Sequence, residues 1–193
     1  MKIYEPKERD VAALPFRDRV VQHSILSVIE PIWEGRFIYD SYACRVGKGA
    51  HKGADRAQSM MRQVLRNHGE LYVFKADISK FFYSIDHEIT KQLIRKRISC
   101  KKTLDLLDEI IDSSGGGVGL PIGNLTSQLF ANMYLHELDE FAKHTLREKY
   151  YVRYMDDFCT FHHNKDHLRH VRISVERFLF EIIKIKTNAK TKI

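Results

Sequence analysis

The sequence is poor in cysteine, proline and tryptophan, with three, four and one of them among 193 residues. Cys44, Cys100 and Cys159 are an odd number and include no CxxC pair. This pattern suits a reducing compartment better than a disulfide framework or a zinc site of the usual cysteine spacing. We therefore expect a protein of a reducing compartment, the cytoplasm.

The sequence also lacks long apolar runs, since no stretch approaches the ~18 apolar residues of a membrane span. The first ten residues mix charges of both signs with no apolar run behind them, so we expect no signal peptide and no membrane partner. Acidic residues are the minority, with 25 Asp and Glu against 32 Lys and Arg and a net charge of +7. An excess of positive charge favours an anionic partner, and nucleic acid is the first candidate.

What the chain does have is enough apolar material to fold, with 44% hydrophobic and 30% charged residues. Helical spacing of apolar residues predicts helices at about 17–32, with an interruption at Pro31, and at 54–67, 86–98, 104–111, 121–141 and 164–183. Runs rich in β-forming residues predict a buried strand at 71–78, a hairpin at 150–161 and an edge strand in the tail. This order predicts an α+β fold with a split βαβ antiparallel sheet.

Aspartates stand at two points of this predicted sheet. Asp77 follows a buried apolar strand, and Asp156 and Asp157 lie in the turn of an aromatic hairpin. If the strands are neighbours, the carboxylates converge and repel one another unless divalent cations neutralise them. Oxygen ligands of this kind select Mg²⁺, and two ions about 3.5–4 Å apart are suited to phosphoryl transfer. The alternative is an ordinary solvated turn, which leaves Asp77 on its buried strand unexplained.

Three ordered boxes of the sequence resemble motifs of reverse transcriptases. Residues 154–157 (YMDD) resemble the YxDD box, and residues 119–128 (GLPIGNLTSQ) resemble the template-and-nucleotide motif. Asp77, with residues 81–82 (FF) and 85–87 (IDH), resembles the first palm motif. Residues 18–22 and the loop at 41–51 are similar to fingers segments of group II intron and related bacterial reverse transcriptases. The resemblance covers nearly the whole chain.

The resemblance implies a right-hand polymerase with fingers and palm, its palm helices on one face of the sheet. Residues 1–70 would be fingers and 71–193 palm, with a helical insertion at about 95–118 and the thumb missing from this chain. The implied activity is RNA-directed DNA polymerase, with an RNA template, a DNA or RNA primer and dNTPs. Two Mg²⁺ ions would be the cofactor, with Mn²⁺ as a substitute, and a basic accessory protein would be a further partner.

The resemblance also implies roles for single residues. Asp77 and Asp156 would hold the metal ions, with Asp157 in support and the Ile78 carbonyl as a further ligand. Phe82 would be the aromatic gate that excludes a ribose 2′-hydroxyl, unless it is a core residue like its neighbour Phe81.

Other roles concern the nucleotide, the template and the leaving group. Arg45 and Lys48, and more weakly Arg19, would reach the triphosphate or the template, the alternative for each being a solvated charge. Lys190 would protonate the leaving pyrophosphate, the alternative being a generic basic strand. The remaining expected contacts are Ile122 and Gly123 with the nucleotide, and Ser127, Gln128, Tyr154 and Met155 with template and primer.

One departure from the family pattern is informative. Most reverse transcriptases begin the template-and-nucleotide motif with Gln-Gly and end it with Ser-Pro, where this chain has Ile122-Gly123 and Ser127-Gln128. This variant resembles the diversity-generating retroelement branch, whose enzymes copy RNA with errors at adenines. Isoleucine offers shape but no hydrogen bond to the nucleotide, so we expect low fidelity. Alternatives are a retron-like or defence-associated reverse transcriptase, or a catalytically weak RNA-binding palm fragment.

Overall fold

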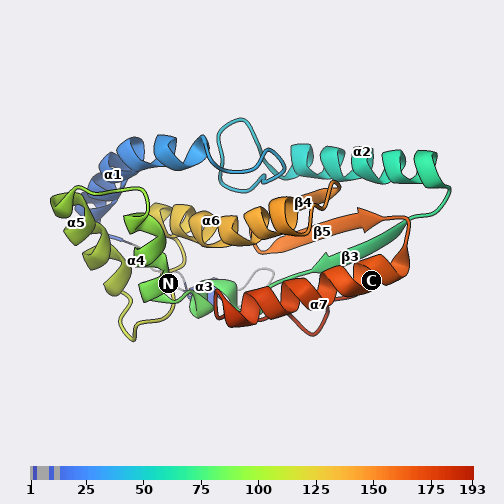
Figure 1. The fold of residues 1–193 in the computed structure, drawn as a ribbon. Helices are drawn as coiled ribbons and strands as arrows, with labels where there is room; N and C mark the ends of the chain where they lie inside the picture. Colours follow the sequence, from blue (N-terminus) through green and yellow to red (C-terminus); the bar gives the residue numbers. More distant parts are fainter. Residues whose placement is uncertain (1, 4–8, 11–13) are drawn as a thin grey trace. The chain divides into compact units, whose positions relative to one another are not determined.

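A computed structural model describes residues 2–3, 9–10 and 14–193 of the chain. These residues form two compact units. Figure 1 shows their helices and strands, coloured along the sequence. The first unit contains residues up to 36 together with 82–134, and the second contains residues 37–81 and 135–193. None of the helices in these described ranges is long and apolar enough to cross a membrane.

The first unit begins with a short antiparallel pair, β1 (Lys2–Ile3) and β2 (Arg9–Asp10), followed by α1 (Phe16–Glu34). The buried face of α1 repeats every three or four residues through Gln22, Leu26, Ile29 and Trp33. The prediction that Pro31 interrupts this helix is wrong, since the helix continues to Glu34. We attribute the extra turn to burial of Ile29 and Trp33, which offsets the hydrogen bond lost at the proline.

A helical hairpin makes up most of the rest of the first unit. The chain passes through α3 (Phe81–Ser84) into α4 (His87–Arg95) and α5 (Lys101–Asp112). Asp86 caps α4 as the sequence predicts, because its carboxylate accepts a hydrogen bond from the Ile89 N–H at 3.0 Å. Ion pairs join the two helices, Arg95 with Asp108 and Lys91 with Asp112. The predicted glycine-rich loop follows at 113–119.

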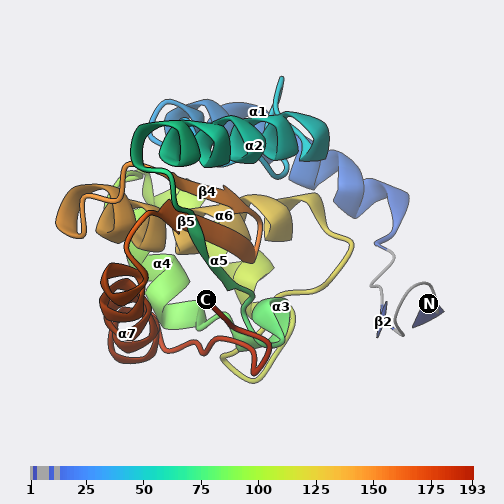
Figure 2. The ribbon, with the colours of Figure 1, turned by 90° about the vertical axis from the view of Figure 1, so that its right-hand side faces the viewer.

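The second unit is built on an antiparallel sheet of β3 (Tyr72–Ala76), β4 (Tyr151–Tyr154) and β5 (Asp157–His162), in the order β3-β5-β4. Helix α2 (Ala50–His68) packs on β4 and β5, and α7 (Lys165–Glu181) packs on β3 and β5. The two helices lie on opposite faces of the sheet (Figures 1 and 2). Helix α2 lies in the range expected as fingers, and its Met60 and Val64 cover the apolar face that Val152 and Phe161 form.

Helix α6 (Leu125–Glu140) belongs to the first unit up to Tyr134 and to the second from Leu135. Most of its residues between Thr126 and Asp139 are buried, and it continues into a π-helical turn, η1 (Phe141–Thr145). Its fully buried apolar residues are Phe130, Ala131, Met133, Tyr134, Leu135 and Leu138.

The predicted edge strand in the tail does not form. After Ile183 the chain makes two isolated β-bridges instead. Lys192 pairs with Lys75 of β3, and Thr187 pairs with Ile78, just beyond the end of β3. A turn at Asn188 interrupts the strand, because Asn188 accepts hydrogen bonds from the N–H groups of Lys190 and Thr191. On the opposite edge of the sheet, Ser41 bridges to Arg153 of β4.

Candidate active site at the end of the sheet

Three aspartates meet at one end of the sheet in the second unit. Strand β3 ends at Ala76, opposite Phe158 of β5, so Asp77 and Asp157 come next on neighbouring strands. Asp156 lies in the two-residue turn that joins β4 to β5. The structure thus brings together the acids that the sequence singles out, because the strand register and the turn place them side by side.

The three carboxylates differ in environment. Burial raises the pKa of Asp156 to about 6, and the charges of Asp77 and Asp157 and a hydrogen bond with Asp77 add to this rise. Asp157 is half-exposed and its Oδ1 lies 3.6 Å from Nζ of Lys75. The ionised form of Asp156 is therefore disfavoured in the protein alone, and a cation beside it would relieve the repulsion.

The turn between the strands has an unusual backbone. Tyr154 pairs with Asp157, which leaves Met155 and Asp156 as the turn residues. Met155 has φ of 52°, in the left-handed region that glycine normally occupies at this place in a hairpin. Tyr154 is 45% exposed and Met155 is half-buried. The turn therefore holds a non-glycine residue under backbone strain directly before Asp156.

The donor set fits magnesium that arrives with a substrate. Across the described ranges, no three His, Cys, Asp or Glu side chains converge closely enough to hold a metal ion by themselves. Mg²⁺, however, is usually bound by one or two carboxylates together with substrate phosphates and water. Asp77 and Asp156 supply such a pair of carboxylates. Ile78, whose carbonyl is the further expected ligand, is buried and bridged to Thr187.

The sequence pattern does not identify Asn188, which contacts Asp77 twice. Its N–H donates to the Asp77 carbonyl at 2.7 Å, and its Nδ2 donates to the Asp77 carboxylate at 3.3 Å. The only signal in the sequence is an asparagine in a short polar run, which indicates a turn. Lys190, the expected proton donor, has an exposed side chain two residues away.

The two cations expected to bind the triphosphate are used within their own loop, residues 37–49. Arg45 Nη1 donates to the carbonyls of Ile38 at 2.7 Å and Ser41 at 2.8 Å. Lys48 Nζ donates to the Tyr39 carbonyl at 2.7 Å and lies 3.7 Å from the centre of the Tyr39 ring. Both cations stabilise the loop, and binding a triphosphate would require them to exchange these partners.

The other expected contact residues lie in the first unit. Phe82 is half-buried beside Phe81, which is a core residue, and Arg19 is exposed. Of the template-and-nucleotide motif, Ile122 and Gln128 are half-buried, Gly123 is exposed with φ of 106°, and Ser127 is buried. The side-chain oxygens of Asn124 and Thr126 are buried and have no hydrogen-bond partner among the described residues.

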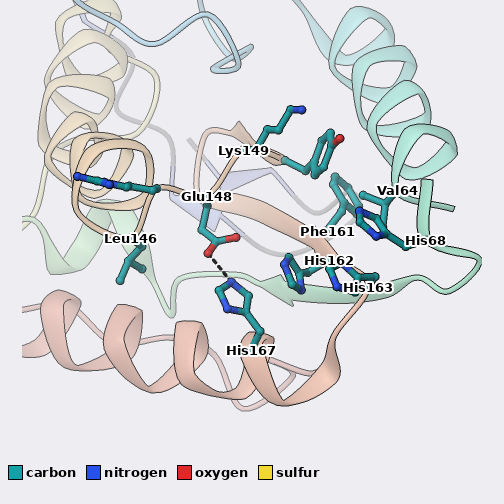
Figure 3. A pocket seen from close by; sticks show the side chains of 11 residues that line it. Val64, His68, Leu146, Glu148, Lys149, Phe161, His162, His163 and His167 are labelled. Atoms are coloured by element: carbon teal, nitrogen blue, oxygen red, sulfur yellow. Dashed lines mark hydrogen bonds and ion pairs between the residues drawn. The ribbon is translucent and has the colours of Figure 1, made fainter. Parts of the chain in front are cut away.

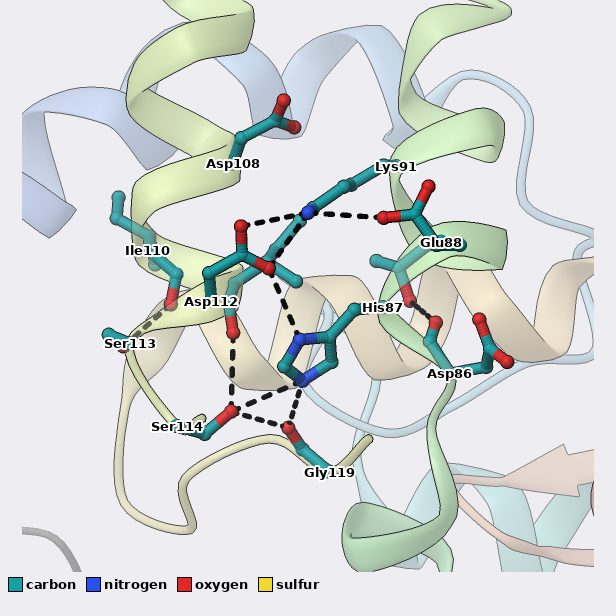
Figure 4. Close-up of polar contacts among 12 residues, drawn as sticks. Asp86, His87, Glu88, Lys91, Asp108, Ile110, Asp112, Ser113, Ser114 and Gly119 are labelled. Atoms are coloured by element: carbon teal, nitrogen blue, oxygen red, sulfur yellow. Dashed lines mark hydrogen bonds and ion pairs between the residues drawn. The ribbon is translucent and has the colours of Figure 1, made fainter. Parts of the chain in front are cut away.

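A buried histidine fixes the loop that leads into this motif (Figure 4). His87 Nε2 lies 2.7 Å from the Gly119 carbonyl, and Nδ1 lies 3.3 Å from Asp112. Ser114 Oγ is 3.2 Å from Nε2 and donates to the Gly119 carbonyl at 2.7 Å. This serine, histidine and aspartate do not form a nucleophile with its base, because both ring nitrogens already face acceptors. The group instead anchors Gly119 to α4 and α5.

A pocket of about 230 Å³ lies at the other end of the sheet, where β5 ends (Figure 3). His167 in this pocket contacts Glu148 at 2.7 Å, and His68 and His163 stack with ring centres 3.9 Å apart. Among the described residues, the pocket side chains include no group of three that could hold a metal ion. The pocket is lined by Val64, His68, Leu146, Arg147, Glu148, Lys149, Tyr150, Phe161, His162, His163 and His167.

Known proteins resemble this chain in sequence and fold. Protein YkfC of Escherichia coli is 29% identical over 161 residues, which cover 77% of this chain and 41% of that protein. The group II intron-encoded protein LtrA of Lactococcus lactis is 28% identical, over 70% of this chain and 23% of its own length. Apo telomerase of Candida tropicalis, truncated from its C-terminal domain, has the same fold with a TM-score of 0.61 at 17% identity, over 88% of this chain and 38% of that one.

The chain spans less than half the length of these relatives. Residues 5–193, nearly all of it, match the family described as reverse transcriptase (RNA-dependent DNA polymerase). The palm-like sheet with its aspartates at one end agrees with that match, and the fold is the α+β fold with fingers and palm that the sequence predicts. The chain therefore belongs to the reverse transcriptase family.

Proposed function

We propose that this chain is the fingers-and-palm part of an RNA-directed DNA polymerase that extends a primer 3′-hydroxyl with dNTPs on an RNA template. The observation that carries the proposal is the partly buried Asp156 beside Asp77, in the turn of the YMDD hairpin of a reverse transcriptase family member. A module that only binds RNA attracts the phosphates with basic residues and gains nothing from converging aspartates. Burial and the neighbouring charges of Asp77 and Asp157 raise the pKa of Asp156, so these acids repel one another when no cation is bound.

In this proposal the primer 3′-hydroxyl loses its proton to water, its oxygen attacks the α-phosphorus of the dNTP, and the bond from that phosphorus to pyrophosphate breaks. Asp77 and Asp156 would hold the metal ions, with Asp157 in support and the Ile78 carbonyl as a further ligand. A bound pair of Mg²⁺ ions would supply activation of the hydroxyl and charge neutralisation at the leaving oxygen. Asn188 keeps the Asp77 carboxylate oriented through its amide. Lys190 stays a prediction for the proton donor to pyrophosphate.

Primer extension on an RNA template tests this function. The wild type should extend the primer, and Asp156→Ala should abolish extension while leaving RNA binding intact. Asp166→Ala is a matched control, because Asp166 is an exposed acid in the first turn of α7. Equal extension by wild type and Asp156→Ala would refute the proposal. RNA binding without extension by either would favour a catalytically weak RNA-binding palm instead.

We further propose that the enzyme is of the error-prone, diversity-generating type, with a basic accessory protein as a partner. The support is Ile122, a half-buried apolar residue where most family members place glutamine. Without an amide to hydrogen-bond the incoming nucleotide or its surroundings, discrimination rests on shape alone. Ile122→Gln should lower misincorporation opposite template adenines, and unchanged fidelity would favour a retron-like or defence-associated enzyme.

A further inference from the structure

We propose that Arg153 is a positioning residue of the catalytic turn: its guanidinium holds the Met155 carbonyl and thereby fixes the strained backbone that presents Asp156. The inference rests on the proposed function for its catalytic consequence. Its structural part concerns the turn alone, and the two parts can be tested separately.

The guanidinium of Arg153 is fixed by a buried acid. Both Arg153 and Asp139 have fully buried side chains. Arg153 Nε donates to Asp139 Oδ1 at 2.8 Å and Nη2 donates to Oδ2 at 2.7 Å, so the pair is bidentate. The Tyr151 hydroxyl also donates to Asp139 at 2.9 Å. Such a pair orients the guanidinium plane as well as neutralising its charge.

The orientation of the guanidinium directs another donor at the turn. Nη1 donates to the Met155 carbonyl at 3.0 Å, two residues further along the chain. Met155 is the turn residue with φ of 52°, and its carbonyl belongs to the peptide that leads into Asp156. A hydrogen bond from a fixed, charged donor opposes rotation of this peptide and offsets the strain at Met155.

Arg153 also forms hydrogen bonds with the 37–49 loop. The Arg153 N–H donates to the Asp40 carbonyl at 2.9 Å, and its carbonyl accepts from the Tyr42 N–H at 3.0 Å. Nη2 reaches the Ser41 hydroxyl at 3.2 Å. The backbone bonds form whichever side chain stands at position 153, so a side-chain substitution tests the turn without removing them.

Lysine cannot replace arginine in this role. A guanidinium has five N–H donors spread over a planar fork, whereas an ammonium is a single point charge. Lysine at 153 would keep the charge beside Asp139 but could not span Asp139 and the Met155 carbonyl together. Arg153→Lys therefore separates neutralisation of the buried acid from positioning of the turn. Ser41→Ala is the matched control, because it removes one contact of the guanidinium and leaves the turn contact in place.

Steady-state primer extension should show the difference. Arg153→Lys should lower kcat about tenfold or more, with KM for dNTP changed less than about threefold, and Ser41→Ala should stay within about twofold of wild type. Thermal unfolding identifies any general loss of folding. Wild-type activity in Arg153→Lys would overturn the inference.

A double variant tests the turn itself. Glycine adopts positive φ without strain, so the turn of Met155→Gly needs less support. In the Met155→Gly background, Arg153→Lys should therefore lower kcat less than about threefold. If Arg153→Lys lowers kcat by the same factor with and without Met155→Gly, the inference is overturned. If Arg153→Lys does not fold, Arg153→Met with Asp139→Leu removes the turn contact without leaving a buried charge, and the same loss of kcat is expected.

Crystal structures of the wild type and Arg153→Lys provide a readout that needs no activity. Met155 should keep positive φ in the wild type and leave that region in the variant. An unchanged turn in the variant would refute the inference even if the chain extends no primer. Failure of the wild type to extend primers would refute the proposed function and leave this structural test in force.

Discussion

Replacing Asp156 by asparagine should stabilise the metal-free protein while it abolishes primer extension. The pKa of Asp156 rises to about 6 because of burial and the neighbouring charges of Asp77 and Asp157. Against an ordinary pKa of 3.8, this rise corresponds to a penalty of at most about 3 kcal/mol on the ionised carboxylate. Because the side chain is partly exposed, solvent screening reduces the expected effect to about 1–2 kcal/mol.

The sign of the effect depends on pH. Below about pH 4 the carboxyl is protonated in both the folded and the unfolded chain, so Asp156 carries no penalty. As pH rises from about 4 to 6, the unfolded chain ionises first and the folded chain loses stability, and the full penalty remains above about pH 6. The gain in Asp156→Asn should therefore be complete at pH 8 and much smaller at pH 4.5.

Thermal unfolding in EDTA measures this gain. For a chain of this size, about 1–2 kcal/mol corresponds to a rise in Tm of roughly 2–8 °C. Asp157→Asn is the matched control: Asp157 is half-exposed and lies 3.6 Å from Lys75, so its neutralisation should change stability by less than about 0.5 kcal/mol. A Tm for Asp156→Asn that is unchanged or lower at pH 8, or a rise that is equal at both pH values, would refute the reasoning.

Three further predictions concern the rest of the site and the fold. Mg²⁺ with a dNTP should raise the Tm of the wild type but not that of Asp77→Asn, because a ligand stabilises only the folded state that binds it; an equal rise in both would argue against Asp77 as a metal ligand. The Asn164 side-chain oxygen caps α7 by accepting a hydrogen bond from the His167 N–H at 3.0 Å. In denaturant unfolding, Asn164→Ala should lower the free energy of unfolding by about 1 kcal/mol, and Asn164→Asp should leave it nearly unchanged. An alanine variant as stable as the wild type would contradict this. His87→Leu removes the ring that contacts the buried Gly119 carbonyl and should lower the free energy of unfolding by about 2 kcal/mol. Ser114→Ala, which removes the other contact to that carbonyl, should lower it less. The reverse order would show that the Ser114 hydroxyl is the main anchor.

The helix cap at Asp86 was predictable from the sequence for a local reason, since it depends on residues only three apart. The convergence of the aspartates was predictable only in part. The strand that ends before Asp77 and the hairpin turn that holds Asp156 are each visible in a short stretch of sequence. That the two meet depends on the pairing of β3 with β5, which the sequence analysis had to assume.

Features that depend on distant partners were not predictable. Asp139 and Arg153 each look like an ordinary surface charge in the sequence, but in the structure they form a buried ion pair between α6 and β4. Arg45 and Lys48 are basic residues of a glycine-containing loop, and no spacing reveals that they bind carbonyls of that loop. The alternating Ile and Lys of the tail favour a strand, but the turn at Asn188 and its contacts with Asp77 prevail.

The bridges along the two outer strands also bear on how the sheet behaves in a crowded solution. Bare strand edges recruit strands from other molecules and start aggregation. Here Lys75 of β3 exchanges hydrogen bonds with Lys192 at 2.9 and 3.1 Å, and Arg153 of β4 is bonded to Asp40 and Tyr42. The backbone groups nearest the aspartates are thus already occupied, and lysines flank the β3 edge. The end of the sheet that carries the aspartates can therefore stay exposed without offering a bare strand edge to another copy of the protein.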